Sequence, residues 1–587
     1  MNFDTILIHL GEFGPWQRRN NLLLWLPLIG SGVNVMVAAL AVMAPRHGYR
    51  CRNSCDVTGD FTWQVPGHAP GDIFPSLDVN SSFYSPDSPD YCQHYMAIPA
   101  GDGGDSCTFN RSHIIHCRAG DDFAYEHFEM ERTVATDNNL VCGRYFWTII
   151  VDELFMLGLF LGSSLFGVLS DRLGRRPALL SSVLTCALGN LAGCATTSAW
   201  SYGLTRLVSA GGSQGVCVVA MTMVMEYSGV RERVPLVPWV TWSTLLTSYS
   251  AIPFALGEAV PPLLATGLKD WRIFQAVISL LIAVTALVWP LLPESPRWLI
   301  AQGRLPEARQ VIEAASESNQ VRLTGEVWAG GRDTGGPPSS PQPVYGVRDL
   351  ARTSQLPITL ALFLCWPVIT LLYYGLSLSA DKIHMTDNVF LSFVLVALIE
   401  IPSNLIVPLV IDILGRRPIF ALTQLVPGLC CIAAAFLQPG TAVFSVLTLG
   451  AKALVTAAFT ICYLYTAQLF PTSVRATAVG ACSTMARLGG AAAPFVGKYL
   501  TELTGSVSDI LPLCVFGAVG VLGGLVAFIL PDTVGFPLPD TFQDVEDIKD
   551  NQKPFWTCYR GPQSLRKGKD SEQSTSNFGT FSQAIHR

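Results

Sequence analysis

Twelve long apolar stretches constrain the fold of this chain more than any other feature of its sequence. A bilayer core is about 30 Å thick, and an α-helix needs about 20 mostly apolar residues to cross it. Only 14% of the 587 residues are charged, whereas soluble domains average about 25%. The chain is therefore predicted to be an all-α membrane protein embedded in a lipid bilayer, with no nucleic acid partner. The windows are residues 21–43, 146–169, 178–197, 201–226, 234–257, 273–292, 356–379, 387–411, 418–438, 442–467, 476–500 and 511–531.

Arginines at the ends of these windows predict the orientation of the chain. Short cytoplasmic loops carry an excess of Lys and Arg. Arg18 and Arg19 precede the first window, and further arginine groups follow the second, fourth and eighth windows. We therefore expect both termini in the cytoplasm. Residues 1–20 carry charges and lack the pattern of a cleavable signal peptide, so they are predicted to be a cytoplasmic N-terminus.

The segment between the first two windows, residues 44–144, differs in composition from the other loops. It holds 14 acidic residues, 7 Arg and no Lys. Its six cysteines are typical of a disulfide framework in an oxidising compartment, with the pairing left open. Asn80 and Asn110 stand in N-glycosylation sequons, although a single sequon also arises by chance. We expect a large extracellular loop and a plasma-membrane location. The cysteines are Cys51, Cys55, Cys92, Cys107, Cys117 and Cys142.

The two halves of the chain repeat each other. Asp171-Arg-Leu-Gly-Arg-Arg-Pro177 recurs as Asp412-Ile-Leu-Gly-Arg-Arg-Pro418, 241 residues later. Such a match is typical of a duplicated six-helix unit with parallel halves. The predicted parts are an N-terminal bundle at 21–298, a cytoplasmic linker at 299–355, a C-terminal bundle at 356–536 and a cytoplasmic tail at 537–587.

The repeated motif has a mechanical interpretation. A Gly-containing turn with paired arginines allows the bundles to meet closely at the cytoplasmic face, and its Asp can cap the N-terminus of a neighbouring helix. Gln468 replaces the acidic Glu226 in the second half, so either the ion pair is lost or an amide hydrogen bond replaces it. Two copies in register favour a gate over simple positive-inside placement. The predicted gating residues are Asp171, Gly174, Arg175, Arg176, Glu226, Arg233, Asp412, Gly415, Arg416, Arg417 and Arg475.

Several motifs together resemble a known family. The two Asp-x-Leu-Gly-Arg-Arg loops are similar to the signature of the major facilitator superfamily. The narrower motifs resemble the solute carrier 22 family of organic cation, anion and carnitine transporters. This resemblance implies twelve helices in two six-helix bundles that rock about a central site. The motifs are Leu10–Gln17, Pro293–Trp298, Tyr463–Thr472, Ser483–Gly489 and Gly535–Thr541, together with the cysteine-rich first loop.

Three ionisable residues lie inside the windows of the second half: Glu400, Lys452 and Arg487. A charge at mid-membrane costs about 2.5–3.5 kcal/mol on insertion scales and usually faces a pathway. These residues therefore predict a central cavity of mixed charge. The alternative is that Glu400 pairs with Arg487 or Lys452 and only ties helices together.

The resemblance adds a substrate class to this cavity. In the family, cation carriers tend to have Asp at the position of Arg487, whereas anion and carnitine carriers have Arg there, and Lys452 also matches the latter. Arg487 is then expected to bind a carboxylate through two parallel hydrogen bonds. Glu400 leaves room for a positive group, so a zwitterion such as carnitine or β-alanine satisfies all three charges. The rival hypothesis is an organic cation transporter that uses Glu400.

Aromatic side chains complete the predicted site. Trp366 and Tyr373 are seven residues apart and so share a helix face. The faces of such rings attract ammonium groups, and the resemblance places both at substrate-contact positions. Phe459 and Tyr463 are weaker candidates of the same kind. Ordinary packing is the alternative for the aromatics, and an interhelical hydrogen bond is the alternative for the last candidate, Gln214.

Three classes of function differ in how much of the sequence they account for. A secondary carrier accounts for the retained gate motifs and the intramembrane charges, whereas a receptor on the same fold accounts only for the large first loop. An enzyme is rejected because the sequence has no Walker loop, no metal-ligand spacing and no nucleophile elbow. We expect no cofactor and no metal, an unknown coupling ion such as sodium or a proton, and a monomer.

Overall fold

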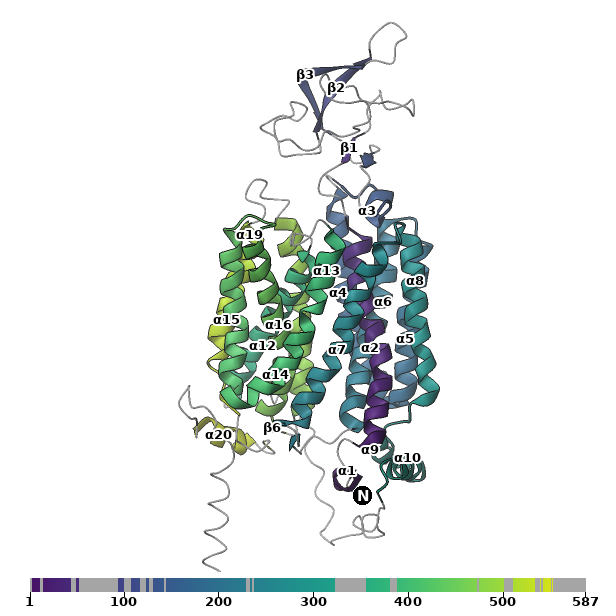
Figure 1. The fold of residues 1–587 in the computed structure, drawn as a ribbon, viewed down its shortest axis with the longest axis vertical. Helices are drawn as coiled ribbons and strands as arrows, with labels where there is room; N and C mark the ends of the chain where they lie inside the picture. Colours follow the sequence, from purple (N-terminus) through teal and green to yellow (C-terminus); the bar gives the residue numbers. More distant parts are fainter. Residues whose placement is uncertain are drawn as a thin grey trace, which may run out of the picture.

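The structure is a computed structural model that carries no ligands. It describes residues 3–10, 14–43, 49–51, 93–99, 107–116, 123–125, 130–141, 144–227, 233–234, 237–321, 355–380, 388–471, 474–500, 510–533, 539, 542–550 and 552. Long helices run roughly side by side in two groups, the first half of the chain in one and the second half in the other (Figure 1).

The first group consists of helices from residues 15 to 291. Helix α6 packs against both α4 and α5, while α2 packs against α6, α7 and α8. Glycines allow this close approach, since a Cβ on Gly162 of α4 would overlap the carbonyl oxygen of Gly211 on α6. The helices are α2 (Pro15–Ala41), α4 (Phe146–Leu173), α5 (Arg175–Cys194), α6 (Ala199–Tyr227), α7 (Trp242–Ala265), and α8 (Trp271–Thr285) continued by the 3₁₀ turn η2 (Ala286–Leu291).

The second group consists of helices from residues 356 to 527. Helix α15 packs against α16 and α19, and α12 packs against α16, α17 and α19. The helices are α12 (Leu356–Leu378), α13 (Val389–Leu398), α14 (Glu400–Leu414), α15 (Arg416–Ala435), α16 (Ala442–Leu469), α17 (Arg475–Pro494) continued by the π-helical turn η5 (Phe495–Tyr499), and α19 (Ile510–Ala527).

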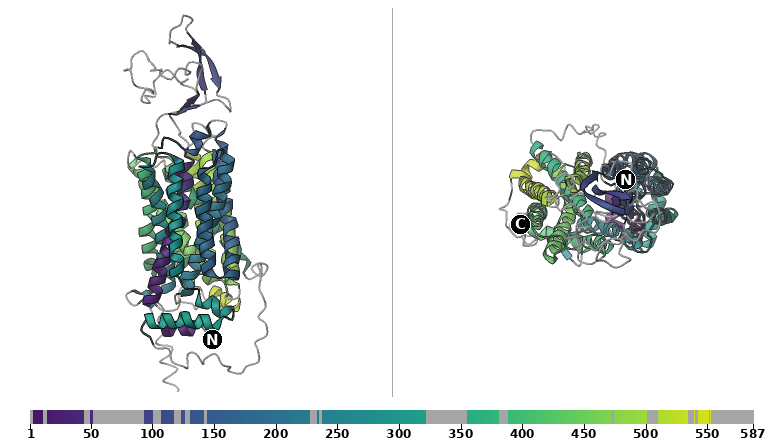
Figure 2. Two further views of the ribbon diagram at one scale, coloured as in Figure 1. Left: turned by 90° about the vertical axis from the view of Figure 1, so that its right-hand side faces the viewer. Right: turned by 90° about the horizontal axis from the view of Figure 1, so that it is seen from above.

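The two groups meet along a few helices. Helix α7 of the first half packs against α13 and α14, and α4 packs against α17. Seen from above, the groups stand side by side (Figure 2). Outward-facing leucines such as Leu165 and Leu280 are more than 60% exposed, as expected for side chains that contact lipid. The interface between the groups is where a central site can form.

Ten of the helices are long and apolar enough to cross a membrane, counted over the described residues. They coincide with ten of the twelve predicted windows. The other two windows hold α7, of which Ala251–Ala265 is a shorter apolar helix, and α17. The total of twelve crossings therefore stays a prediction.

The fifth window, 234–257, was placed too early in the sequence. Its first residues form the paired strands β5 (Arg233–Val234) and β6 (Val237–Thr241), and α7 runs from Trp242 to Ala265. Pro238 on β6 accords with the late start of α7, since proline lacks the backbone N–H that a helix interior needs. The gating candidate Arg233 consequently lies on a strand.

The remaining elements lie beyond the two ends of the helices. Strands β1 to β4 stand past one end, near α3, whereas α1, α9, α10 and α20 lie past the other (Figure 1). Strand β1 pairs antiparallel with β4, and β2 with β3, with a register shift between Tyr95 and Met96. The bounds are α1 (Phe3–Leu10), β1 (Tyr49–Cys51), β2 (Gln93–Pro99), β3 (Cys107–His116), β4 (Phe123–Tyr125), α3 (Val134–Asp137), α9 (Pro296–Ala301), α10 (Leu305–Ser318) and α20 (Phe542–Asp550).

Candidate functional site

A buried ion pair lies at the centre of the second half. The Lys452 ammonium on α16 lies 2.7 Å from the Glu400 carboxylate at the start of α14, and the two side chains are 1% and 3% exposed. Lys452 Nζ also donates a hydrogen bond to Ser377 Oγ at 2.7 Å. The alternative considered for Glu400, a pair with Lys452, is therefore the arrangement found. Within this pair each charge neutralises the other.

Glu258 on α7 joins this pair from the other half of the chain. Its side chain is fully buried, and Oε1 accepts a hydrogen bond from the Tyr373 hydroxyl at 3.2 Å. Lys452 Nζ lies 3.2 Å from the centre of the Tyr373 ring. Glu258 is also within electrostatic reach of Glu400 and Lys452. Sequence reasoning missed Glu258 because the fifth window ended one residue before it.

Arg487 lies nearby on α17 and is half-buried. Its guanidinium is close enough to Tyr374, Tyr463 and Cys217 to act on them electrostatically. Arg487 Nε has no hydrogen-bond partner, and the described residues include no acidic side chain paired with it. A half-buried arginine with open hydrogen-bonding capacity is suited to an anionic ligand.

The helix that carries Arg487 is held tightly against α12. Thr370 Oγ1 on α12 donates to the carbonyl oxygen of Ala486 at 2.6 Å. Gly489 approaches the Pro367 carbonyl so closely that no Cβ would fit. These contacts fix the helix on either side of Arg487, so its backbone position is well defined.

The four predicted aromatic residues form one continuous array between α12 and α16. The ring centres of Trp366 and Tyr463 are 4.6 Å apart, those of Tyr463 and Phe459 5.5 Å, and those of Phe459 and Tyr373 5.6 Å. Trp366 Nε1 donates to Thr466 Oγ1 at 3.1 Å. Trp366 and Tyr373 do share a helix face, as their spacing predicted. Both are buried, and Phe459 and Tyr463 are half-buried.

Gln214 on α6 is the only predicted site residue of the first half. Its side chain is half-buried. The structure assigns it no hydrogen bond among the described residues, so the alternative to a cavity position, an interhelical hydrogen bond, is not found there. Ser213, one residue earlier, instead bonds to Ser31 of α2, with 2.8 Å between the two hydroxyls.

The motif of the first half forms a compact polar cluster at the end of α4. Arg175 donates to both Glu226 oxygens, the shortest contact being 2.8 Å, and its Nη1 lies 2.9 Å from Asp171. The carboxylate that caps the N-terminus of α5 belongs to Glu294, which accepts from the backbone N–H groups of Arg175 and Arg176 at 3.0 and 3.2 Å. The expectation that Asp171 caps a neighbouring helix was therefore wrong. Its position at a helix C-terminus leaves it next to Arg175 instead.

The second half builds the same backbone geometry with different side chains. Asp532 accepts from the Arg416 N–H at 3.3 Å, as Glu294 does for α5. Arg416 Nη1 donates to Thr533 Oγ1 at 3.1 Å, and Thr533 donates to Gln468 at 3.2 Å. An amide thus takes part where the first half has a carboxylate, as one of the two alternatives for Gln468 anticipated.

Three further arginines are predicted gating residues: Arg176, Arg417 and Arg475. Arg176 Nε donates to the Trp289 carbonyl at 3.1 Å, with its guanidinium 4.4 Å above the Trp289 ring. Arg475 donates to the Pro539 carbonyl at 3.3 Å. Arg417 is half-buried at the start of α15. The side chains of Arg233 and Asp412 lie outside the described part of the structure, as do those of the predicted disulfide and glycosylation residues.

Comparisons with known proteins match this architecture. The family model "Sugar (and other) transporter" matches residues 121–541. The chain is 30% identical over 568 residues to "Solute carrier family 22 member 7" of Bos taurus, covering 93% of this chain and 96% of the relative. The chain belongs to the solute carrier 22 family.

Two further relatives in this family match over nearly their full length. "Organic cation transporter protein" of Drosophila melanogaster is 28% identical, over 96% of this chain and 97% of its own. "Organic cation/carnitine transporter 2" of Homo sapiens is 28% identical, over 93% and 94%. Among solved structures, a partially occluded, inward-open form of the xylose transporter XylE of E. coli shares the fold, with a TM-score of 0.54 and 14% identity, over 89% of this chain and 99% of that one.

This solute carrier 22 protein is therefore a membrane transporter of organic ions with the major facilitator fold. Its family model and its relatives are those of transporters, which are not enzymes. The resemblance stated from the sequence motifs is confirmed at the level of the family. The substrate class is not resolved by these comparisons.

A second buried charge of this solute carrier 22 protein was missed by sequence reasoning. Arg206 on α6 is fully buried and donates to Asn34 Oδ1 and Asn190 Oδ1, both at 3.0 Å. Asn190 Nδ2 also donates to Asn34 Oδ1 at 2.9 Å. Asp152 on α4 is 3% exposed and lies within electrostatic reach of Arg206. Asparagines inside an apolar window were the available sequence signal.

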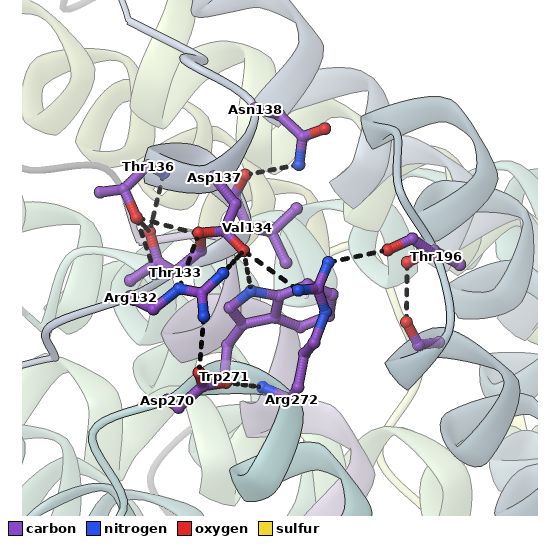
Figure 3. Close-up of polar contacts among 11 residues, drawn as sticks. Arg132, Thr133, Val134, Thr136, Asp137, Asn138, Thr196, Asp270, Trp271 and Arg272 are labelled. Atoms are coloured by element: carbon purple, nitrogen blue, oxygen red, sulfur yellow. Dashed lines mark hydrogen bonds and ion pairs between the residues drawn. The ribbon is translucent and has the colours of Figure 1, made fainter.

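The last part of the first loop is fastened to the start of α8 (Figure 3). Arg132 donates to both oxygens of Asp137, at 3.1 and 3.0 Å, and lies 3.3 Å from Asp270. Trp271 Nε1 donates to Asp137 Oδ2 at 3.0 Å. Asp137 raises the pKa of Arg132 through this hydrogen bond and its charge. The cluster joins the base of the first loop to the first helix group.

Proposed function

We propose that this protein is a plasma-membrane carrier of small organic ions that bear a carboxylate, either anions or zwitterions such as carnitine and β-alanine. The single observation that supports this class is Arg487, a half-buried cation with no acidic partner among the described residues. A carboxylate that reaches it gains charge-assisted hydrogen bonds in a region of low dielectric constant. A simple cation meets an unfavourable charge at the same place.

Lys452 has a different role in this proposal from Arg487. Its charge is already balanced by Glu400 at 2.7 Å, so it contributes less to the binding of a free carboxylate than the sequence suggested. The aromatic array of Trp366, Tyr373, Phe459 and Tyr463 offers ring faces to the positive end of a zwitterion. Gln214 is retained as a polar candidate on the first half.

The transport mechanism that we propose is alternating access, with twelve membrane-spanning helices in two bundles that rock about this site. The helices α7 and α17 that fall outside the ten apolar candidates are counted among the twelve, since both lie at the contact between the groups. The two gates close the cytoplasmic side. The carrier acts as a monomer, with residues 299–355 as cytoplasmic linker and 537–587 as cytoplasmic tail.

The first loop is proposed to be extracellular, with Asn80 and Asn110 glycosylated and its six cysteines in disulfides. Both termini are then cytoplasmic. The strands β1 to β4 stand at the end of the helices opposite to α9 and α10 (Figure 1), which supports this assignment because the gate motifs carry arginines at the latter end.

Uptake by cells that express the protein tests the substrate class. Radiolabelled carnitine, β-alanine and benzoate are compared with tetraethylammonium, with and without sodium. We expect uptake of at least one carboxylate, and at least about a tenfold loss of that uptake in Arg487→Ala, which removes a charge-assisted bond of about 1.5–3 kcal/mol. Arg487→Lys is expected to recover part of the uptake, because it restores the charge without the planar fork.

The matched control is Thr484→Ala, an exposed position one turn earlier on α17. It should leave both uptake and the amount of protein at the cell surface unchanged. Uptake of tetraethylammonium alone, or full carboxylate uptake by Arg487→Ala, would contradict the proposal.

A further inference from the structure

Glu258 is a buried carboxyl group that plays no part in the proposed binding of substrate. It is fully buried on α7 of the first half, while the groups that face it belong mainly to the second half. Tyr373 on α12 donates to it at 3.2 Å, and Lys452 on α16 and Glu400 on α14 act on it electrostatically. Any motion that separates the two halves therefore also removes Glu258 from these neighbours.

The charges around Glu258 do not balance. Two carboxyl groups share the neighbourhood of one ammonium group, and Lys452 makes its 2.7 Å ion pair with Glu400. Glu258 accepts a hydrogen bond from the neutral Tyr373 hydroxyl and also meets the Glu400 carboxyl group within hydrogen-bonding reach. Its Oε2 has no hydrogen-bond partner among the described residues. An uncompensated charge costs several kcal/mol in such a buried place. A proton on Glu258 removes that cost.

Arg487 and Glu258 lie in the same neighbourhood, because they share two neighbours. Arg487 acts on Tyr374 and Cys217, and Glu258 acts on the same two side chains. A substrate carboxylate bound at Arg487 adds a negative charge to this neighbourhood, which disfavours a second negative charge on Glu258. Binding of the substrate and binding of a proton then favour each other through charge, which is a thermodynamic linkage between the two sites.

The other elements packed against α7 add no further charge at this level among the described residues. Helix α2 meets α7 through a close approach at Gly32 and Gly257. Helix α13 contributes the apolar side chains Val394 and Ala397, which pack with Ala259. From α6 the titratable neighbour is the thiol of Cys217.

We propose that Glu258 is a proton-binding site that couples proton movement to transport. Glu258 holds a proton while the halves meet at Tyr373, and releases it when they separate and water reaches the carboxyl group. One proton then moves in the same direction as each carboxylate-bearing substrate. This inference rests on the proposed function for its substrate, whereas the proton site itself can be tested without any substrate.

The first experiment measures transport in proteoliposomes that contain the full chain and an internal pH-sensitive dye. With radiolabelled carnitine, β-alanine and benzoate as probes and an acidic exterior, we expect the wild type to accumulate a probe and to acidify the interior. Glu258→Gln, which resembles the protonated form, should still exchange labelled for unlabelled probe but lose the acidification and the pH-driven accumulation. Equal acidification by both proteins would overturn the proposal.

The second experiment measures the separation of the two halves in the absence of substrate. Fluorophores are introduced through unnatural amino acids at Leu204 and Val443, which are exposed near the starts of α6 and α16. Energy transfer in the wild type should change between pH 5 and pH 8, because deprotonation favours separation of the halves. Glu258→Gln should stay at the acidic value throughout. An unchanged pH response in this variant would contradict the proposed proton site, even if no probe is transported.

Two further variants test whether a lost pH response in Glu258→Gln comes from a general loss of structure. Glu131→Gln removes an exposed carboxylate that pairs with Lys269 at 3.1 Å, and it should keep the wild-type pH response. Tyr373→Phe keeps the ring beneath Lys452 but removes the hydroxyl donor, so it should shift the pH midpoint of the response. If the wild type transports none of the carboxylate probes but Glu258→Gln still abolishes the pH response, the proposed substrate is wrong and the proton site stands.

Discussion

The two clusters around Gly174 and Gly415, which we propose to be gates, have the same backbone geometry and different charges. In each half a glycine with positive φ, Gly174 at 104° and Gly415 at 97°, ends one helix and begins the next. In each half an acidic residue caps that next helix. A tyrosine hydroxyl in each half donates to a proline carbonyl at 2.6 Å. Duplication has therefore preserved the scaffold to the level of single hydrogen bonds.

The difference lies in the charged contact built on that scaffold. Arg175 makes forked hydrogen bonds to Glu226, and both side chains are about 10% exposed. In the second half Thr533 stands between Arg416 and the neutral Gln468. An ion pair holds its geometry more strongly than a hydroxyl–amide relay. The comparison suggests that the first gate is the stiffer of the two.

Among these substitutions, Glu226→Gln should have the largest effect on stability and uptake. It replaces the carboxylate of the first gate with the amide that the second gate has at Gln468. Removing one partner of a largely buried pair costs about 3 kcal/mol, so we expect a lower midpoint of thermal unfolding in detergent and reduced uptake. The matched variant Gln468→Ala should cost about 1 kcal/mol, the value of an ordinary hydrogen bond. Equal losses in the two variants would remove the proposed difference between the gates.

Gly174→Ala and Gly415→Ala test the shared scaffold. Both glycines have backbone angles that are almost restricted to glycine, and an alanine there costs about 1–3 kcal/mol. A Cβ would also lie 2.6 Å from the capping carboxylate, Glu294 in one half and Asp532 in the other. We expect similar destabilisation of both variants in thermal unfolding. A neutral substitution at either glycine would show that its loop relaxes freely.

Tyr227→Phe and Tyr465→Phe should have the smallest effects. Each removes one buried hydroxyl bond to a proline carbonyl, worth about 1 kcal/mol. Thermal unfolding should show equal shifts for the two variants, with uptake largely retained. Unequal shifts would mean that the two halves are less alike than their identical 2.6 Å distances indicate.

The sequence predicted most of the helices and the composition of both gates. Apolar windows depend on local composition, and the repeat of Gly174 at Gly415 is visible without coordinates. It did not predict that Glu294 rather than Asp171 caps α5. A cap depends on where a distant segment returns, and Glu294 lies 119 residues from Arg175.

The central site was predicted in part. Lys452, Glu400 and Arg487 stood out because charges are rare in apolar windows, and the aromatic array follows from helix periodicity. Glu258 was not predicted because the fifth window was placed too early in the sequence and ended at residue 257. Arg206 was missed because its partners, Asn34 and Asn190, come from two other helices.

By itself, the sequence determined that this chain is a duplicated helical membrane protein of the solute carrier 22 family with charges in its interior. Only the tertiary structure decided which of those charges meet: Lys452 with Glu400, Glu258 with Tyr373, and Arg487 with no acidic side chain among the described residues. The physical reason is that hydropathy and periodicity are properties of one helix. The partner of a buried charge depends on the rotation and depth of several helices packed together.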